Sequence, residues 1–180
     1  IHMADLLALS RHIIDTGVVD SGTGPTNRLS NELSEIADDL AIVESFSHCV
    51  AWKTSEGLAC FDASGVVTGP LVVEALNKWT STPVSHLIYT HGHADHIGGS
   101  PAFAAAAAAK GVPNPRVIGH ENIAPRVQRY RDTDGWNRFI NAKQFGGIRV
   151  EHQYSLGGSK NHFIPPDVLE VQESFREQYV

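Results

Sequence analysis

Hydrophobic and polar positions change their period along the chain, and each period predicts a different kind of element. Near the N-terminus, apolar residues at approximately helical spacing are followed by Gly17 and a loop over residues 21–25, which predicts a short helix. Between residues 35 and 62 the apolar runs are shorter and are separated by turn residues such as Ser55-Glu56-Gly57. This pattern predicts short strands joined by tight turns.

The middle of the chain alternates between helical and strand patterns. Residues 71–79 have a helical apolar face, and residues 86–89 form a short apolar run that is typical of a strand. Residues 116–119 are the next strand candidate. With a further helix between the last two strands, residues 58–119 read strand, helix, strand, helix, strand. That order indicates an α/β layer with crossover connections.

Boundary signals mark the second helix of this layer. Ser100 is the expected N-cap, Pro101 stands at the expected first helical position, and Gly111 lies just past an alanine run. The last third of the chain is less regular. Residues 121–147 are polar, and residues 168–171 predict either a strand or the start of a helix.

Length, composition and charge favour one globular domain that acts on a small molecule. A single domain is expected over residues 1–180, and residues 1–3 are expected to include a cloning remnant, because Ile1-His2 ahead of Met3 resembles one. The chain is 42% hydrophobic and 19% charged, which is ordinary for a globular protein. A net charge of −6 without a basic run argues against nucleic acid or an anionic membrane surface as a partner.

Two cysteines are too few for a disulfide framework. Cys49 and Cys60 are expected to lie diagonally across the hairpin as reduced core residues. No apolar run approaches the ~20 residues that span a bilayer, and no signal-peptide pattern opens the chain. We therefore expect a cytoplasmic protein, with a removed signal peptide as the open alternative.

The segment from Thr90 to His96 carries the densest chemistry of the chain. His91 and His93 are one residue apart, so both rings can face one metal ion. Asp95 and His96 are adjacent in the sequence, so their side chains more naturally face a second metal position beside the first. Four such side chains within six residues suit two ions roughly 3.5 to 4 Å apart better than one closed tetrahedral site. The motif follows a predicted strand and precedes Gly98-Gly99 and a predicted helix. This is the structural context that a functional motif requires.

This segment resembles the His-x-His-x-Asp-His motif of the metallo-β-lactamase superfamily. The likeness continues upstream, where residues 57–62 resemble the family strand that ends in an aspartate, and downstream, where residues 117–121 occupy the place of a common family strand. The match covers about residues 35–121. The resemblance implies an α/β fold of the αββα sandwich type, of which this chain would hold the N-terminal portion.

By the same resemblance, His91 and His93 would bind the first metal, and Asp95 and His96 the second, with Asp95 also orienting a bridging water. Two Zn²⁺ ions are the expected cofactor, and the ligand types also permit iron or manganese. The implied reaction is hydrolysis of an ester-like bond by a metal-bound hydroxide. The family's further ligands cannot be placed among the downstream histidines, which are His120, His152 and His162.

Other polar residues are weaker candidates for the site. Asp62 either fixes a ligand imidazole or caps its strand, and the resemblance favours the first role. His120 is expected to be structural. Arg126 and Asn137 lie in a segment that either is a solvated polar helix or walls a pocket for an anionic substrate. The mixture of residues in that segment is loosely similar to the alkyl sulfatase branch, where a sulfate ester would be the substrate.

Three hypotheses for function remain open at this point. The first is a metal-dependent hydrolase with a dinuclear zinc centre. The second is an iron-dependent dioxygenase acting on a persulfide, because some superfamily members use the same motif in that way. The third is a non-catalytic fragment with a half-assembled metal site, which would form homo-oligomers through an exposed half-core.

Overall fold

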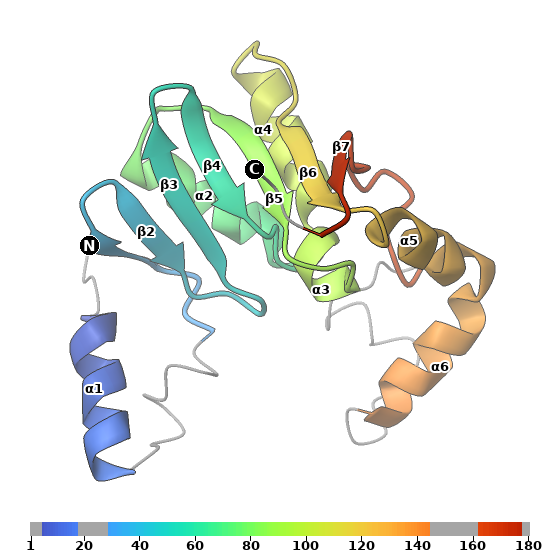
Figure 1. Ribbon diagram of the computed structural model, residues 1–180, viewed down its shortest axis with the longest axis horizontal. Helices are drawn as coiled ribbons and strands as arrows, with labels where there is room; N and C mark the ends of the chain where they lie inside the picture. Colours follow the sequence, from blue (N-terminus) through green and yellow to red (C-terminus); the bar gives the residue numbers. More distant parts are fainter. Residues whose placement is uncertain (1–4, 18–28, 145–161, 178–180) are drawn as a thin grey trace.

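A computed structural model describes residues 5–17, 29–144 and 162–177, and its centre is one seven-stranded sheet (Figure 1). The strands follow each other in the sheet in sequence order. They are β1 (Leu33–Ala37), β2 (Leu40–Val43), β3 (Cys49–Thr54), β4 (Gly57–Phe61), β5 (Val84–Tyr89), β6 (Arg116–His120) and β7 (Glu173–Phe175).

The first four strands form an antiparallel meander, as the short apolar runs predict. Strands β3 and β4 turn at Ser55-Glu56, and their register pairs Ala51 with Cys60. Cys49 therefore lies diagonally from Cys60, and both thiols are free and buried, as expected. Burial alternates along these strands, since Ala51 is fully buried while the neighbouring Trp52 is 52% exposed.

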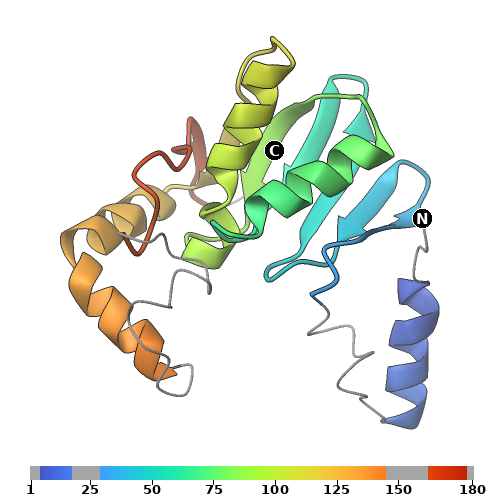
Figure 2. The same ribbon diagram turned by 180° about the vertical axis from the view of Figure 1, so that it is seen from behind.

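The second half of the sheet is parallel and confirms the predicted alternation. Strands β4, β5, β6 and β7 pair in parallel. The crossovers pass through α2 (Gly69–Trp79) and α4 (Ser100–Ala109), which lie side by side on one face of the sheet (Figure 2). The buried side chains of α2, among them Val72 and Leu76, pack on that face and form the core with Leu58 and Leu87.

The N-terminal ends of α2 and α4 approach each other through glycines. A Cβ atom on Gly99 would lie 2.0 Å from the carbonyl oxygen of Ala63 and 2.8 Å from the Cα of Gly69. The Gly99 N–H donates to the Ser64 carbonyl oxygen at 2.9 Å, and the Ala63 N–H donates to the His96 carbonyl oxygen at 2.7 Å. These contacts join the loop after β4 to the loop after β5, because only a residue without a side chain fits between them.

Two local expectations were wrong. Helix α4 begins with Ser100 itself, and Gly99 precedes it, so the Ser100 hydroxyl makes no cap hydrogen bond. It accepts instead from the backbone N–H of Leu169 at 3.0 Å. Residues 168–171 form neither strand nor helix, and the strand is Glu173–Phe175, which pairs with β6.

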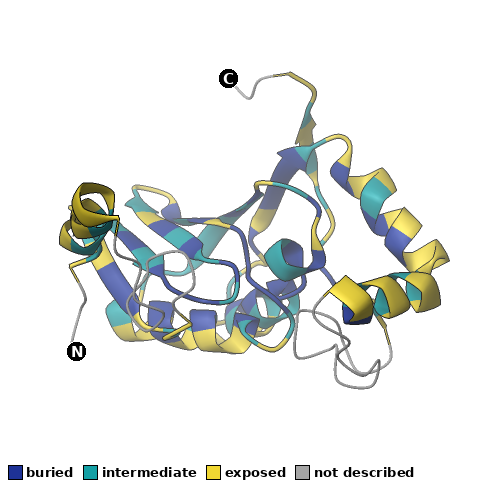
Figure 3. Cartoon of the chain, turned by 90° about the horizontal axis from the view of Figure 1, so that it is seen from below, coloured by how far each residue is buried: buried dark blue, intermediate teal, exposed yellow. Residues whose placement is uncertain are grey.

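Four further helices, of which α3 has only four residues, complete the described elements. They are α1 (Leu6–Thr16), α3 (Ala94–Ile97), α5 (Ile123–Asp132) and α6 (Asp134–Gln144). Helix α1 confirms the N-terminal prediction, ends at Gly17 with a left-handed backbone, and has no buried residue, so it lies on the surface (Figure 3). No helix among the described residues is long and apolar enough to span a membrane. Within the described chain, one sheet and one helical layer represent half of the expected sandwich.

Candidate metal centre

The motif lies at the edge of the sheet where the parallel strands β4 and β5 end. Asp62 follows β4, and residues 90–96 follow β5, so both loops leave the sheet at their carboxyl ends. The Asp62 N–H donates to the carbonyl oxygen of Ile88 at 2.8 Å, which places Asp62 directly beside the end of β5. Ligands of open α/β sheets bind at such edges.

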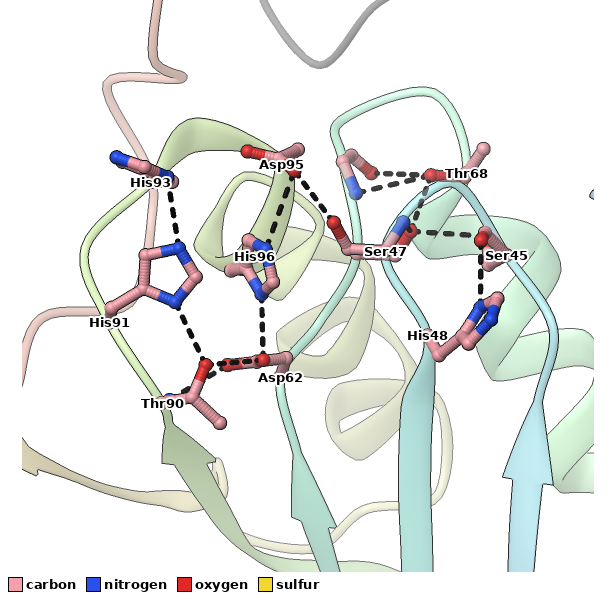
Figure 4. A network of polar contacts seen from close by, with 12 residues as sticks. Ser45, Ser47, His48, Asp62, Thr68, Thr90, His91, His93, Asp95 and His96 are labelled. Atoms are coloured by element: carbon pink, nitrogen blue, oxygen red, sulfur yellow. Dashed lines mark hydrogen bonds and ion pairs between the residues drawn. The ribbon is translucent and has the colours of Figure 1, made fainter. Parts of the chain in front are cut away.

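The three motif histidines are brought into contact. The Nε2 atom of His91 lies 2.9 Å from Nδ1 of His93, and the ring centres of His91 and His96 are 3.9 Å apart (Figure 4). The Nε2 atom of His96 lies 3.4 Å from Oδ2 of Asp95. All four predicted ligands therefore gather at one point of the sheet edge.

Asp62 holds the motif through hydrogen bonds with Thr90 and His96. Its side chain is buried, Oδ1 accepts from the Thr90 N–H at 2.8 Å, and Oδ2 accepts from the Thr90 hydroxyl at 2.6 Å. The same Oδ2 lies 2.7 Å from Nδ1 of His96, so His96 donates from Nδ1 and keeps Nε2 toward Asp95. Of the two roles considered for Asp62, the geometry corresponds to fixing an imidazole. Asp62 has a φ of 61°, a left-handed conformation that aspartate tolerates better than most residues.

The three imidazoles have different protonation tendencies. Burial is the largest cause that lowers the pKa of His91 and of His93. A positive charge on His96 adds to the lowering at His91, and the positive charge of Arg126 adds to it at His93. Burial also acts to lower the pKa of His96, but the hydrogen bond and negative charge of Asp62, with a contribution from Asp95, outweigh it and raise this pKa. His91 and His93 thus favour the neutral form that can bind a metal.

Ser47 is a site residue that the sequence did not reveal. It lies in the loop between β2 and β3, is 7% exposed, and donates from its hydroxyl to Oδ2 of Asp95 at 2.7 Å. Its backbone N–H lies 3.4 Å from the Ser64 hydroxyl, which also contacts Ser45 and Thr68 at 3.0 and 2.7 Å. A serine 48 positions before Asp95 carries no local pattern that could have identified it.

The donor set suits zinc, but it is incomplete within the described chain. Two ligand atoms on one tetrahedral zinc, each about 2.0 to 2.1 Å from the ion, lie about 3.3 Å apart. The pair from His91 and His93, at 2.9 Å, and the pair from Asp95 and His96, at 3.4 Å, are close to that spacing. No group of three or more His, Cys, Asp or Glu side chains among the described residues is arranged to hold an ion. The described residues therefore supply two donor pairs, and the dinuclear centre stays a prediction.

His120 does not complete the site. His120 accepts from the Asn122 N–H at 3.1 Å through Nδ1, and its Nε2 donates to the Arg176 carbonyl oxygen at 2.5 Å. Both ring nitrogens are thus used in structural contacts, as expected for His120. His152 lies outside the described residues.

A pocket of about 400 Å³ opens beside the motif. His93 and Asp95 form one wall, and helices α5 and α6 contribute Arg126 and Asn137, the two residues expected to contact substrate. The amide nitrogen of Asn137 is already bonded to the carbonyl oxygen and the hydroxyl of Thr133, at 2.9 and 2.8 Å. Arg126 is the better placed of the two, because only one of its N–H groups has a partner within the described chain, the Tyr130 hydroxyl at 3.0 Å.

Comparison with known proteins identifies the family. The model of the metallo-β-lactamase superfamily matches residues 42–165, which is more than half of the 180 residues. The chain therefore belongs to this superfamily, whose members are mostly metal-dependent hydrolases. No curated protein matches the chain in sequence.

Solved structures support the same fold. The stereoselective inverting sec-alkylsulfatase Pisa1 from Pseudomonas sp. is 17% identical, with a TM-score of 0.52, over 78% of this chain and 24% of its own. A metallo-β-lactamase of Cronobacter sakazakii with a HARLDQ motif is 16% identical, with a TM-score of 0.54, over 81% and 46%. BJP-1, a subclass B3 metallo-β-lactamase of Bradyrhizobium japonicum, is 14% identical, with a TM-score of 0.51, over 81% and 46%. The chain spans less than half the length of each of these proteins, and at these identities the likeness shows the fold, here a partial one.

Proposed function

We propose that this chain carries part of the active site of a metal-dependent hydrolase, with zinc bound by His91, His93, Asp95 and His96. The observation that carries the proposal is the convergence of both donor pairs at the carboxyl edge of the parallel strands, inside the family motif. Imidazole and carboxylate are ligands that zinc accepts, and iron or manganese would use the same atoms.

Each residue of the cluster has a distinct task under this proposal. A bound metal would lower the pKa of a coordinated water toward ~7 and polarise the bond to be cleaved. Asp62 keeps the proton of His96 on Nδ1 and leaves Nε2 available. Ser47 holds the Asp95 carboxylate in one orientation. We propose that the substrate contains an ester-like bond, and that it is specifically a sulfate ester. Arg126 in the adjoining pocket supports this candidate, because a guanidinium group binds anionic groups.

Zinc binding by the purified chain tests the proposal directly. Zinc titrated into metal-free protein should bind and raise the melting temperature, and EDTA should reverse the shift. The variant His91→Ala should bind more weakly by at least about tenfold, whereas His12→Ala, on the exposed face of α1, should match the wild type. Equal zinc binding by His91→Ala and the wild type would contradict the assignment of the site.

Metal analysis and activity separate the hydrolase from its rivals. Hydrolysis of thioester, lactone or sulfate-ester substrates that depends on zinc and on His91 supports the proposal. An iron content near one per chain, together with oxygen consumption when a persulfide is added, would refute the hydrolase and support the iron-dependent dioxygenase. Zinc binding without turnover by this chain would show that the described portion binds metal but does not act alone.

A further inference from the structure

Two arginines in the pocket beside the motif lack a carboxylate partner among the residues that the structure describes. Arg126 and Arg129 are three positions apart on α5, and both guanidinium groups lie 5.4 Å from the centre of the Tyr130 ring. Arg126 Nε donates to the Tyr130 hydroxyl at 3.0 Å, so one aromatic side chain positions both cations. Both arginines line the pocket.

The other described arginines in this half of the chain form ion pairs with carboxylates. Arg131, on the same helix, pairs with Glu170 at 3.1 Å, and Arg138 pairs with Asp134 at 3.1 Å. Arg116 and Arg176 also have carboxylate partners, on Glu173 and Glu121. The absence of such a partner therefore distinguishes the arginines that face the pocket from their neighbours within the described chain.

Arg126 is also tied to the metal motif by packing. Its Cδ atom would lie 3.2 Å from a Cβ placed on Gly92, the residue between the two histidines of the first donor pair. Gly92 thus leaves the room in which the Arg126 side chain lies. The position of this guanidinium group is set by the motif loop on one side and by Tyr130 on the other.

The rest of the pocket suits an organic molecule. His93 and Asp95 form the wall on the motif side, and Phe46, Ile140 and Phe163 add apolar surface. A volume of about 400 Å³ lies within the usual range for small-molecule sites. Asp95, the carboxylate in the lining, is engaged with Ser47 and His96 rather than with the arginines.

We propose that this pocket binds the oxyanion group of an organic substrate, with Arg126 as the main contact, Arg129 as the second, and the apolar side chains against the body of the molecule. A guanidinium group offers parallel N–H donors that match the two oxygens of a carboxylate, sulfate or phosphate. The claim that this anion belongs to a substrate rests on the proposed function, because it depends on the cluster at His93 and Asp95 being the reacting site.

Calorimetry on the EDTA-treated, metal-free chain at constant ionic strength tests the pocket by itself. The probes are benzoate, phenyl sulfate and phenyl phosphate, with benzyl alcohol as the uncharged control. At least one anion should bind, and the anion that binds best identifies the oxyanion. Arg126→Gln should weaken that binding by about tenfold or more, and Arg126→Lys should weaken it less. Arg131→Gln, which removes a paired arginine from the same helix, should have no effect.

Equal losses of anion affinity in Arg126→Gln and Arg131→Gln would overturn the proposal. Benzyl alcohol binding as tightly as the anions, or the absence of any anion binding, would also overturn it. Circular dichroism verifies that each variant is folded, and if Arg126→Gln is not, Arg129→Gln and Arg126→Lys decide by the same criterion. A parallel zinc titration separates the two proposals. Anion binding without zinc binding refutes the hydrolase alone, and zinc binding without anion binding refutes the pocket alone.

Discussion

The carboxylate of Asp62 accepts a hydrogen bond from Nδ1 of His96 at 2.7 Å, although the two residues are 34 positions apart in the sequence. Asp62 follows β4, and His96 lies in the short helix α3 after β5. The parallel pairing of β4 with β5 brings these two loops together. A proposed metal ligand of the motif is therefore oriented by a residue of the loop that follows the neighbouring strand.

Replacing Asp62 with Asn should weaken zinc binding by about 10- to 100-fold, because the amide cannot hold the His96 ring as the carboxylate does. The free energy of unfolding should also fall by about 1 to 3 kcal/mol, since a buried, charge-assisted hydrogen bond is lost. Zinc calorimetry and urea denaturation measure the two effects.

Asp39→Asn is the matched control for this change. Asp39 has a φ of 60°, nearly the same as Asp62, but its carboxylate is mostly exposed and lies 3.9 Å from Lys53. Because Asn tolerates the same backbone conformation, this variant should keep wild-type zinc affinity and stability. A comparable loss in Asp39→Asn would assign the effect of Asp62→Asn to the backbone.

Removing the Ser47 hydroxyl should weaken zinc binding several-fold, because Asp95 would no longer be held by the 2.7 Å hydrogen bond. We also expect a loss of about 1 kcal/mol in stability for Ser47→Ala. Calorimetry and urea denaturation measure both quantities. Ser47→Thr retains the hydroxyl and should recover most of the zinc affinity. An unchanged affinity in Ser47→Ala would remove Ser47 from the site.

Ser34→Ala should have the opposite effect on stability. Ser34 is 1% exposed, and its hydroxyl has no hydrogen-bond partner among the described residues. Removing a buried polar atom without a partner relieves its desolvation penalty, so the variant should be as stable as the wild type or more so by about 1 kcal/mol. Urea denaturation compares the free energies of unfolding of Ser34→Ala, Ser47→Ala and the wild type. A clear destabilisation in Ser34→Ala would show that the Ser34 hydroxyl has a hydrogen-bond partner.

Gly99→Ala should prevent the two crossover loops from packing, because the new Cβ would lie 2.0 Å from the Ala63 carbonyl oxygen. We expect the chain to lose more than about 3 kcal/mol of stability or to fail to fold. Gly135→Ala, in α6, where a Cβ meets nothing within 4 Å, should be stabilising by about 0.5 to 1 kcal/mol. Thermal denaturation compares them, and a well-folded Gly99→Ala protein would contradict the close approach.

Cys49 should resist thiol reagents in the folded protein. The hydrogen bond that the Cys49 thiol donates to Cys60, together with burial, raises the pKa of Cys49, so the reactive thiolate is scarce at neutral pH. A colorimetric thiol assay should detect neither cysteine in native protein and both in denaturant. Ser55→Cys, at the exposed hairpin turn, should react at once and serves as the positive control. Fast reaction of the native wild type would show that this part of the sheet opens.

Sequence periods predicted most of the elements because they depend on neighbours a few positions away. The alternation from residue 58 to residue 119 appears as the parallel half of the sheet with α2 and α4 on one face. The errors occurred where a distant partner intervened. Ser100 has the residue type of a helix cap, but its hydroxyl is used by Leu169, 69 positions later. Residues 168–171 lack regular structure, and the short strand that pairs with β6 follows them.

The sequence by itself determined which side chains are the candidate metal ligands, because the four of them lie within six consecutive positions and their chemistry is local. Only the tertiary structure decided how these side chains are oriented. Asp62 and Ser47 reach the motif from 34 and 48 positions away, and Arg126 comes from a helix beyond β6. Such contacts depend on strand pairing and on the close approach at Gly99, which no local pattern of hydrophobic and polar residues records.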